Sequence, residues 1–195
     1  RVRIVERKRG SPMELLVSEM MILANSTWGQ LLADQSLPAI YRTQGGGKVK
    51  LTTVAGEHQG LGVAHYAWSS SPIRRYVDLV NQRQLVAWIR CEALPYPKPD
   101  ELFVFMRDFD AAYEAYTEFQ RSMERYWCLR WLLQEGVRTC PAQVFKEDVV
   151  KVGNIPLLTR LPAMPSLPAG TSIEVEVSAL DLLALSFHAE YKGTR

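Results

Sequence analysis

The sequence predicts an α+β protein, with long helices first and a small β-rich region after them. Before about residue 137, apolar residues recur at the three- and four-residue spacing of helices over long segments. From Thr139 onwards the pattern changes to short segments with a period of two, separated by prolines and glycines. We therefore expect a helical domain over residues 1–137 and a β domain over residues 138–195.

Composition is that of an ordinary globular protein. The 195 residues are 47% hydrophobic and 23% charged, enough for one well-packed domain or slightly more. The net charge of +2 does not indicate nucleic acid by itself. Basic side chains nevertheless gather in residues 1–10, and no acid occurs between Asp34 and Glu57. Such segments suit a surface that follows phosphates, although a charge run is more often a solvated face.

Cysteine usage indicates a reducing compartment. Cys91, Cys128 and Cys140 form no C-x-x-C pair, so we expect reduced thiols in a cytoplasmic protein. The histidines are scattered, so we propose no histidine metal site. No signal peptide is visible and no apolar run is long enough to span a bilayer, so we expect no membrane partner.

A capping box predicts where the first helix begins. Weak alternation over residues 2–7 predicts a short strand, which Gly10 ends. Ser11 can then cap the N–H of Glu14 while the Glu14 carboxylate reaches back, so a helix is expected over Pro12–Asp34.

One carboxylate stands out on that helix. Between Leu15 and Ala33 the only ionisable residue is Glu19, and so apolar a helix is expected to be buried on most sides. Glu19 then either faces a polar cavity or belongs to an exposed polar stripe, and the spacing alone favours the stripe.

Loops and a strand follow. We expect a loop over Gln35–Gly47, a strand over Lys48–Val54 and turns over Gly56–Gly62. The glycines do not predict a cofactor loop, because no strand–turn–helix unit can be built around them.

The most informative segment is predicted to enter a second helix that runs to about residue 89. Ser71 is a good N-cap and Pro72 suits the first helical position. Arg74 and Arg75 would then oppose the helix dipole, a conflict that a bound phosphate would remove. Alternatively, Arg74 pairs with Asp78 and Arg75 is merely solvated. The residues alone do not separate these two interpretations.

A long third helix is expected over Glu101–Glu135, capped by Asp100 and stopped by Gly136. Its aromatic stripe is interpreted as core packing, not as a platform for bases. Four strands are predicted after it, at Ala142–Val152, Ile155–Leu161, Ser172–Ser178 and Leu183–Glu190. They predict a small barrel of the OB type, which lacks base-stacking aromatics in its second and third strands and is expected mainly to brace the helices.

The run Ser70-Ser71-Pro72-Ile73-Arg74-Arg75-Tyr76-Val77-Asp78-Leu79, with Gln82-Arg83 beyond it, resembles the signature of the ribonuclease II (RNB) family. Three further stretches resemble that family in the same order. They are Arg9-Gly10-Ser11-Pro12 leading into Leu16–Asn25, then Pro38-Ala39-Ile40-Tyr41-Arg42, then Gly60-Leu61-Gly62 ahead of Tyr66. The resemblance covers roughly residues 1–135 and only the C-terminal part of the family's catalytic domain, which an OB-type barrel follows in the family.

The resemblance implies a function and roles for particular residues. These enzymes release nucleoside 5′-monophosphates from the 3′ end of single-stranded RNA. The family's arginine matching Arg74 holds the scissile phosphate, so Arg74 is our candidate catalytic residue, and the glutamate matching Glu19 contacts the terminal ribose. The expected substrate-binding residues are Glu19, Arg75, Ser70, Ser71, Tyr66 and Arg42.

The metal-binding half of such a site is missing from the sequence. Two-metal hydrolysis needs clustered carboxylates for two Mg²⁺ ions, which the family supplies as aspartates earlier in its catalytic domain. Here the closest pair, Asp108 and Asp110, would not face each other on a helix. The sequence departs from the family at two further positions: Ser69 stands where the family usually has an aromatic residue, and Gln82 stands where it has a histidine. We expect no metal ligands in this chain and Mg²⁺ only in the intact enzyme.

We interpret the chain as a C-terminal fragment of an exoribonuclease, because Arg1 falls within the first predicted strand. Its expected partners are single-stranded RNA and an N-terminal catalytic portion. Two alternatives remain: a non-catalytic RNA-binding or scaffold protein, and a subunit completed by a separately made N-terminal half. The chain alone is expected to be inactive.

Overall fold

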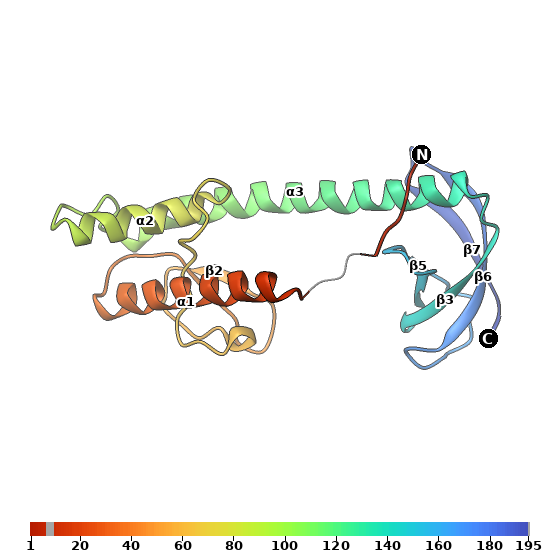
Figure 1. The fold of residues 1–195 in the computed structure, drawn as a ribbon, viewed down its shortest axis with the longest axis horizontal. Helices are drawn as coiled ribbons and strands as arrows, with labels where there is room; N and C mark the ends of the chain where they lie inside the picture. Colours follow the sequence, from red (N-terminus) through yellow and green to blue (C-terminus); the bar gives the residue numbers. More distant parts are fainter. Residues whose placement is uncertain (7–9, 195) are drawn as a thin grey trace. The chain divides into compact units, whose positions relative to one another are not determined.

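A computed structural model of the chain describes residues 1–6 and 10–194 (Figure 1). Two compact units emerge: one from the described residues of Lys8–Glu114, the other from those of Arg1–Arg7 and Ala115–Arg195. Helix α3, Pro99–Gln134, contributes to both units. The mixture of helices and strands confirms the predicted α+β class, whereas the predicted domain boundary at residue 137 stays a prediction.

The first unit is mainly helical. Its remaining elements are α1 (Pro12–Asp34), β1 (Tyr41–Thr43), β2 (Lys50–Thr52), the 3-10 turn η1 (Gln59–Leu61) and α2 (Tyr76–Ile89). Strands β1 and β2 pair antiparallel, with Tyr41 opposite Thr52. β1 lies in a predicted loop, because three residues give too short an alternation for the sequence to reveal.

The start of α1 confirms the predicted capping box. The Ser11 hydroxyl accepts a hydrogen bond from the Glu14 N–H at 3.2 Å, and the Glu14 carboxylate accepts one from the Ser11 N–H at 3.3 Å. The helix ends at Asp34, as expected, with Gln35 as its C-cap.

The prediction that α1 is buried on most sides is wrong for this chain. Asn25, Gly29 and Leu32, the buried residues of the helix, all lie in its C-terminal half. In the N-terminal half Leu16 is 56% and Met20 58% exposed. An apolar sequence requires a partner surface to become buried, and the described residues supply one only to the second half of α1.

Two small cores hold the unit together. Leu32 of α1 packs in one core, whose members are Leu32, Ala39, Tyr41, Ala67 and Leu85. The other core joins α2 to the N-terminal part of α3, and its members are Ile40, Val77, Val80, Leu102 and Met106. Segments 39–41 and 67–68 therefore lie between the helices, which fixes the backbone that leads into residues 69–75.

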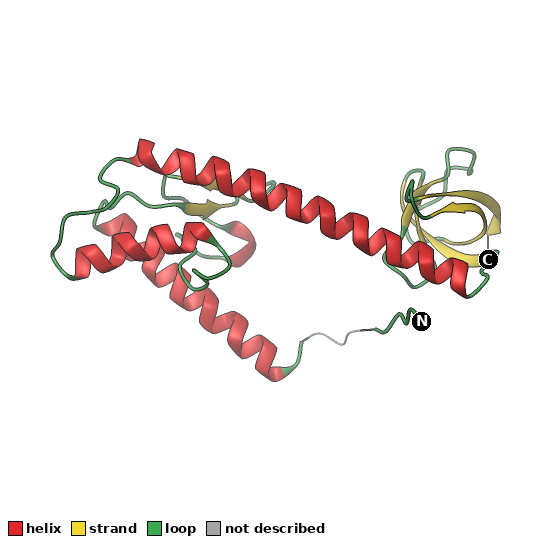
Figure 2. Ribbon diagram, turned by 90° about the horizontal axis from the view of Figure 1, so that it is seen from above, coloured by secondary structure: helices red, strands yellow, loops and turns green. Residues whose placement is uncertain are grey.

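The second unit is a curled five-stranded antiparallel sheet packed on the C-terminal part of α3 (Figure 2). Its strand order is β5-β4-β3-β6-β7. The strands are β3 (Thr139–Lys146), β4 (Val149–Val152), β5 (Leu158–Arg160), β6 (Ser172–Asp181) and β7 (Ser186–Thr194). Leu129 and Leu132 of α3 share one core with Val144 and Val175 of the sheet.

Several predicted boundaries needed correction. The expected strand Ala142–Val152 is two strands, because Glu147 has a φ of 48° and turns the chain between them. The described part of the expected strand at 2–7 is not a strand, and residue 7 lies outside the described residues. There Val2 pairs through its backbone with the Gln134 side-chain amide at 2.9 and 3.0 Å.

Helix α3 agrees with its prediction to within two residues at its start. It ends before Gly136, which has a φ of 62° and allows the Val137 N–H to reach the Leu132 carbonyl at 3.0 Å. Within residues 1–6 and 10–194, no helix is long and apolar enough to cross a membrane.

Candidate functional site

The predicted N-terminus of the second helix is wrong by four residues. The Ser71 carbonyl accepts the N–H groups of Arg74 at 3.2 Å and Arg75 at 3.1 Å, so residues 71–75 form a tight turn. Helix α2 begins only at Tyr76, with Arg75 as its N-cap residue. We call residues 71–75 the arginine turn.

A buried carboxylate explains the shift. Asp78 is 0% exposed, and its Oδ1 accepts the Ser71 N–H at 2.8 Å. Asp78 also places a negative charge in the first turn of α2, where the helix dipole favours it. The Ser71 N–H is thus used by a side chain two turns on, and Ser71 does not cap the helix.

Arg75, not Arg74, pairs with Asp78. The Arg75 Nε lies 2.8 Å from Asp78 Oδ2 and its Nη2 lies 2.8 Å from Asp78 Oδ1, so the two side chains form a bidentate pair. The alternative that paired Arg74 with Asp78 and left Arg75 solvated is therefore wrong. Arg74 is exposed, and its guanidinium makes one hydrogen bond within the described residues, at 3.4 Å to the Ser71 hydroxyl.

Trp68 links two arginines. The Arg75 guanidinium lies 4.2 Å and the Arg42 guanidinium 4.5 Å from the centre of the indole ring. The pKa of Arg42 is lowered by its burial above all; Tyr66 and Tyr113 oppose this, and Arg75 adds to it. Both arginines remain charged, so they gather positive charge beside the arginine turn.

A buried amide fixes the serines before the turn. Asn25 of α1 is 0% exposed, and its Oδ1 accepts the Ser69 N–H at 2.9 Å. Its Nδ2 donates to the Ser70 hydroxyl at 3.1 Å and to the Tyr66 hydroxyl at 3.3 Å. The Ser70 hydroxyl accepts from Asn25 and so keeps its own proton to donate.

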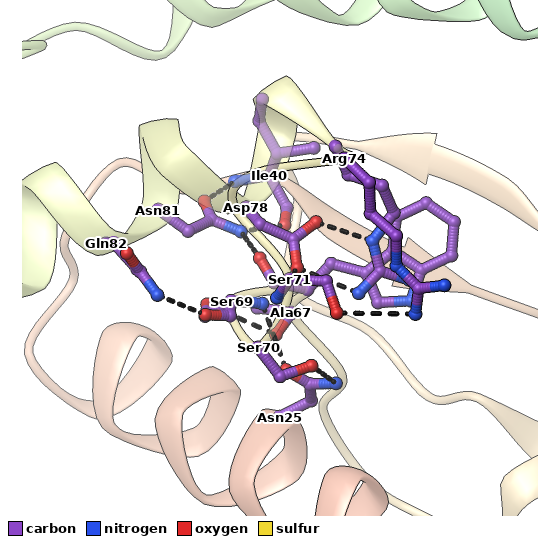
Figure 3. Close-up of polar contacts among 12 residues, drawn as sticks. Asn25, Ile40, Ala67, Ser69, Ser70, Ser71, Arg74, Asp78, Asn81 and Gln82 are labelled. Carbon is purple, nitrogen blue, oxygen red and sulfur yellow. Dashed lines mark hydrogen bonds and ion pairs between the residues drawn. The ribbon is translucent and has the colours of Figure 1, made fainter.

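Two amides of α2 hold the same segment from the other side (Figure 3). Asn81 is 0% exposed, donates to the Trp68 carbonyl at 2.9 Å and pairs with both backbone groups of Ile40. Gln82 donates to the Ser69 carbonyl at 2.6 Å. None of these supports was predicted from the sequence, although Asn25 within the apolar sequence of α1 is a usable signal.

The remaining predicted residues lie apart or are packed. Glu19 is exposed on α1, and within the described residues no interaction joins it to the arginine turn. Tyr66 is 6% exposed, with its ring 5.6 Å from that of His58, edge to face. Ser70, Ser71, Arg74 and Arg75 do lie together, as predicted for a phosphate site, though on a turn and not on a helix end.

His58 is an unusual buried group. It is 4% exposed, and neither ring nitrogen has a hydrogen-bond partner within the described residues. Burial lowers the pKa of His58, and the charge of Arg42 lowers it further. The imidazole is therefore kept neutral at physiological pH.

The donor set of this region fits an anion and not a metal ion. The region offers guanidinium and hydroxyl donors, and its carboxylate, Asp78, is engaged by Arg75 and Ser71. Across residues 1–6 and 10–194, no three His, Cys, Asp or Glu side chains are grouped to hold a metal. The residues described thus do not fit Mg²⁺, which prefers oxygen ligands.

Comparisons with known proteins point to one class. Residues 47–91, which include the arginine turn, match the RNB domain model. An uncharacterised ribonuclease of Synechocystis is 29% identical over 143 residues, which are 60% of this chain and 21% of that protein. Exoribonuclease 2 of Salmonella newport is 45% identical over 51 residues, 26% of this chain and 8% of that enzyme.

Solved structures share the fold. The Dss1 exoribonuclease of Candida glabrata aligns with a TM-score of 0.78 at 22% identity, over 92% of this chain and 29% of its own. Mycoplasma genitalium RNase R in complex with ribose-methylated single-stranded RNA aligns with a TM-score of 0.73 at 13% identity, over 95% of this chain and 42% of its own. The resemblance to the RNB family is confirmed. The chain spans about a fifth of the Synechocystis relative and less of the Salmonella enzyme.

Proposed function

We propose that this chain carries the phosphate- and ribose-contacting half of a 3′-to-5′ exoribonuclease site. Its substrate is single-stranded RNA, which the complete site hydrolyses to nucleoside 5′-monophosphates. The observation that carries the proposal is the Arg74 guanidinium, exposed on a turn whose backbone is fixed by buried side chains. RNB-family resemblance supplies the reaction class.

The chemistry of the arginine turn suits a phosphodiester. The planar fork of Arg74 can hold two non-bridging oxygens as negative charge redistributes during attack. The Ser71 hydroxyl lies 3.4 Å from it, and Asn25 binds the Ser70 hydroxyl and the Ser69 N–H just before the turn. Donors that are fixed in place before the reaction do not have to reorganise when charge develops. Such electrostatic stabilisation of the transition state is usually the largest contribution at sites of this kind.

The complete site would include partners from outside this chain. We propose that an N-terminal catalytic portion, in the same polypeptide or made separately, supplies the carboxylates that bind Mg²⁺. A cytoplasmic location remains part of the proposal, from the cysteine usage. A second candidate is a non-catalytic RNA-binding or scaffold protein, favoured because no three His, Cys, Asp or Glu side chains among residues 1–6 and 10–194 are grouped to hold a metal ion. Aspartates upstream in the parent reading frame would favour the enzyme.

The Arg74→Lys variant tests the proposal in the protein of the parent reading frame, that is, the product of the complete reading frame that encodes this chain. An ammonium keeps the charge but not the bidentate fork, so RNA affinity is expected to stay near that of the wild type. Turnover is expected to fall by roughly 10²–10³-fold, as on loss of one oxyanion donor. Single-turnover decay of a labelled RNA oligonucleotide, beside a binding titration at fixed salt, measures both.

Arg75→Lys and Arg90→Lys serve as comparisons. Arg75 pairs with Asp78, so its replacement is expected to reduce turnover less. Arg90 is exposed at the end of α2, and its replacement should change neither quantity. Near-normal turnover in Arg74→Lys, or a loss confined to binding, would remove Arg74 from the catalytic role.

A further inference from the structure

We infer that Arg75 and Asp78 are positioning residues, which hold Arg74 outward for RNA and do not contact RNA themselves. This inference rests on the proposed function and divides the two adjacent arginines into different roles. It also departs from the sequence interpretation, in which Arg75 binds substrate.

The Asp78 carboxylate joins the two ends of the arginine turn. Its Oδ1 accepts the Ser71 N–H and an Arg75 N–H, both at 2.8 Å, and its Oδ2 accepts the Arg75 Nε–H at 2.8 Å. Three hydrogen bonds at full burial leave this carboxylate well satisfied. Because both ends of the turn, Ser71 and Arg75, attach to one rigid group at the start of α2, Asp78 places the residues between them, Arg74 included.

Arg75 is engaged on its edge and on its face. The edge is paired with Asp78, the face lies 4.2 Å from the Trp68 ring centre, and the side chain is 14% exposed. For a phosphate to use the same edge, Asp78 would have to be released. That would leave an uncompensated buried charge, which is strongly unfavourable.

Arg74 has the opposite surroundings. Its guanidinium is exposed, and its one hydrogen bond within residues 1–6 and 10–194 is a long contact to the Ser71 hydroxyl. Four of its five N–H donors are therefore open to a ligand. The neighbouring positions differ in role because the Arg75 guanidinium is already bound by Asp78 and Trp68, whereas most of the Arg74 guanidinium is open to a ligand.

The salt dependence of RNA binding separates the two roles. Each phosphate contact to single-stranded nucleic acid contributes a slope of about −0.7 to log K against log salt concentration. A single-stranded RNA oligonucleotide is titrated into the full 195-residue chain at several salt concentrations. The variants are Arg74→Gln, the double variant Arg75→Gln/Asp78→Asn, and Arg90→Gln as an exposed control.

The double variant avoids an unpaired buried charge, so it is expected to fold, which its circular dichroism and thermal unfolding would show. Arg74→Gln should reduce the magnitude of the slope by about 0.7. Arg75→Gln/Asp78→Asn should keep the wild-type slope but bind roughly two- to tenfold more weakly, because Arg74 is no longer held in place. Arg90→Gln should change neither quantity.

Two results would overturn the inference: a slope reduced by about 0.7 in the double variant, which would make Arg75 a phosphate contact, or wild-type affinity in that variant, which would make the pair purely structural. A wild-type chain that binds no RNA at any salt concentration would instead overturn the proposed function, and this inference with it. Failure of the inference and failure of the proposed function are distinguishable, because the wild-type chain still binds RNA in the first case and does not in the second.

Discussion

At the residue scale, adjacent side chains of one type receive different surroundings. Arg74 is exposed and Arg75 is paired with a buried carboxylate, although the sequence presents them as equivalent. The difference arises from the turn. Asp78 lies three residues after Arg75 and four after Arg74, and both spacings bring side chains together within a helix. Because α2 begins only at Tyr76, with Arg75 as its N-cap residue, Arg74 lies on the preceding turn and does not share the helix face of Asp78.

Glu19 tests the ribose-contacting part of the proposal. If it faces the terminal ribose in the complete site, Glu19→Ala should reduce discrimination of RNA against DNA, because the 2′-OH is the group that differs. Matched single-stranded RNA and DNA oligonucleotides would be titrated into the protein of the parent reading frame. Glu57→Ala removes an exposed carboxylate elsewhere and should leave the ratio unchanged. Unchanged discrimination in Glu19→Ala would return Glu19 to the polar stripe.

His58 is expected to make stability depend on pH. Burial lowers the pKa of His58 in the folded state, so below about pH 6.5 the unfolded state binds more protons. The free energy of unfolding should therefore be highest above that pH and decrease as the pH falls from there through the lower pKa of the folded state. Urea titrations between about pH 5 and 8 measure it.

The His58→Phe variant removes the titrating group while keeping an aromatic ring against Tyr66. Its unfolding free energy should vary less over this pH range than that of the wild type. His188→Gln is the control, because the His188 side chain is 63% exposed. Equal pH dependence in His58→Phe and the wild type would show that another group is responsible.

At the element scale, α1 and α2 act as supports for the segment between them. Asn25 of α1 and Asn81 of α2 are fully buried, and both bind backbone groups in residues 67–69. Such amides satisfy backbone donors and acceptors that have no strand partner. The N-terminal half of α1, in contrast, leaves its apolar residues exposed, so its sequence pattern alone did not decide its burial.

At Gly29, α1 lies close to the backbone of residues 65–67. A Cβ there would lie 2.9 Å from the Ala67 N and 3.2 Å from the Tyr66 N, both backbone atoms. Gly29→Ala is expected to destabilise the chain by about 1–3 kcal/mol through overpacking, which exceeds the gain of up to about 1 kcal/mol in helix propensity. Urea unfolding measures the change.

Gly47→Ala is the matched control, because nothing lies within 4 Å of the position of its added Cβ. Its unfolding free energy should differ from that of the wild type by less than about 0.5 kcal/mol. A stabilised Gly29→Ala variant would mean that the backbone of residues 65–67 can move away from α1.

At the scale of the whole molecule, the residues proposed to contact phosphate lie together on one short segment of the chain. The exposed arginine and the serines belong to the first unit, whereas no three His, Cys, Asp or Glu side chains of the described residues are grouped to hold a metal ion. This division matches a chain that spans only a fraction of its relatives' length.

The purified chain with Mg²⁺ is expected not to degrade RNA, because in-line attack by an activated water needs metal ions held by carboxylates. A 3′-labelled RNA oligonucleotide would be incubated with the chain and the products resolved by size. The protein of the parent reading frame, assayed in parallel, shows whether the conditions support activity. The expectation would be contradicted if the chain alone released mononucleotides and its Arg74→Lys variant did not.

The sequence by itself determined the α+β class, the capping box of α1, the extent of α3 and the cluster of serines and arginines at residues 70–75. These follow from local patterns, since caps, helical spacing and turn residues act over a few positions. Only the tertiary structure decided that Arg75 and not Arg74 meets Asp78 and that α2 begins at Tyr76. Those outcomes depend on contacts of Trp68 and of the buried amides of Asn25 and Asn81, which join α1, residues 67–69 and α2 and leave no periodic trace in the sequence.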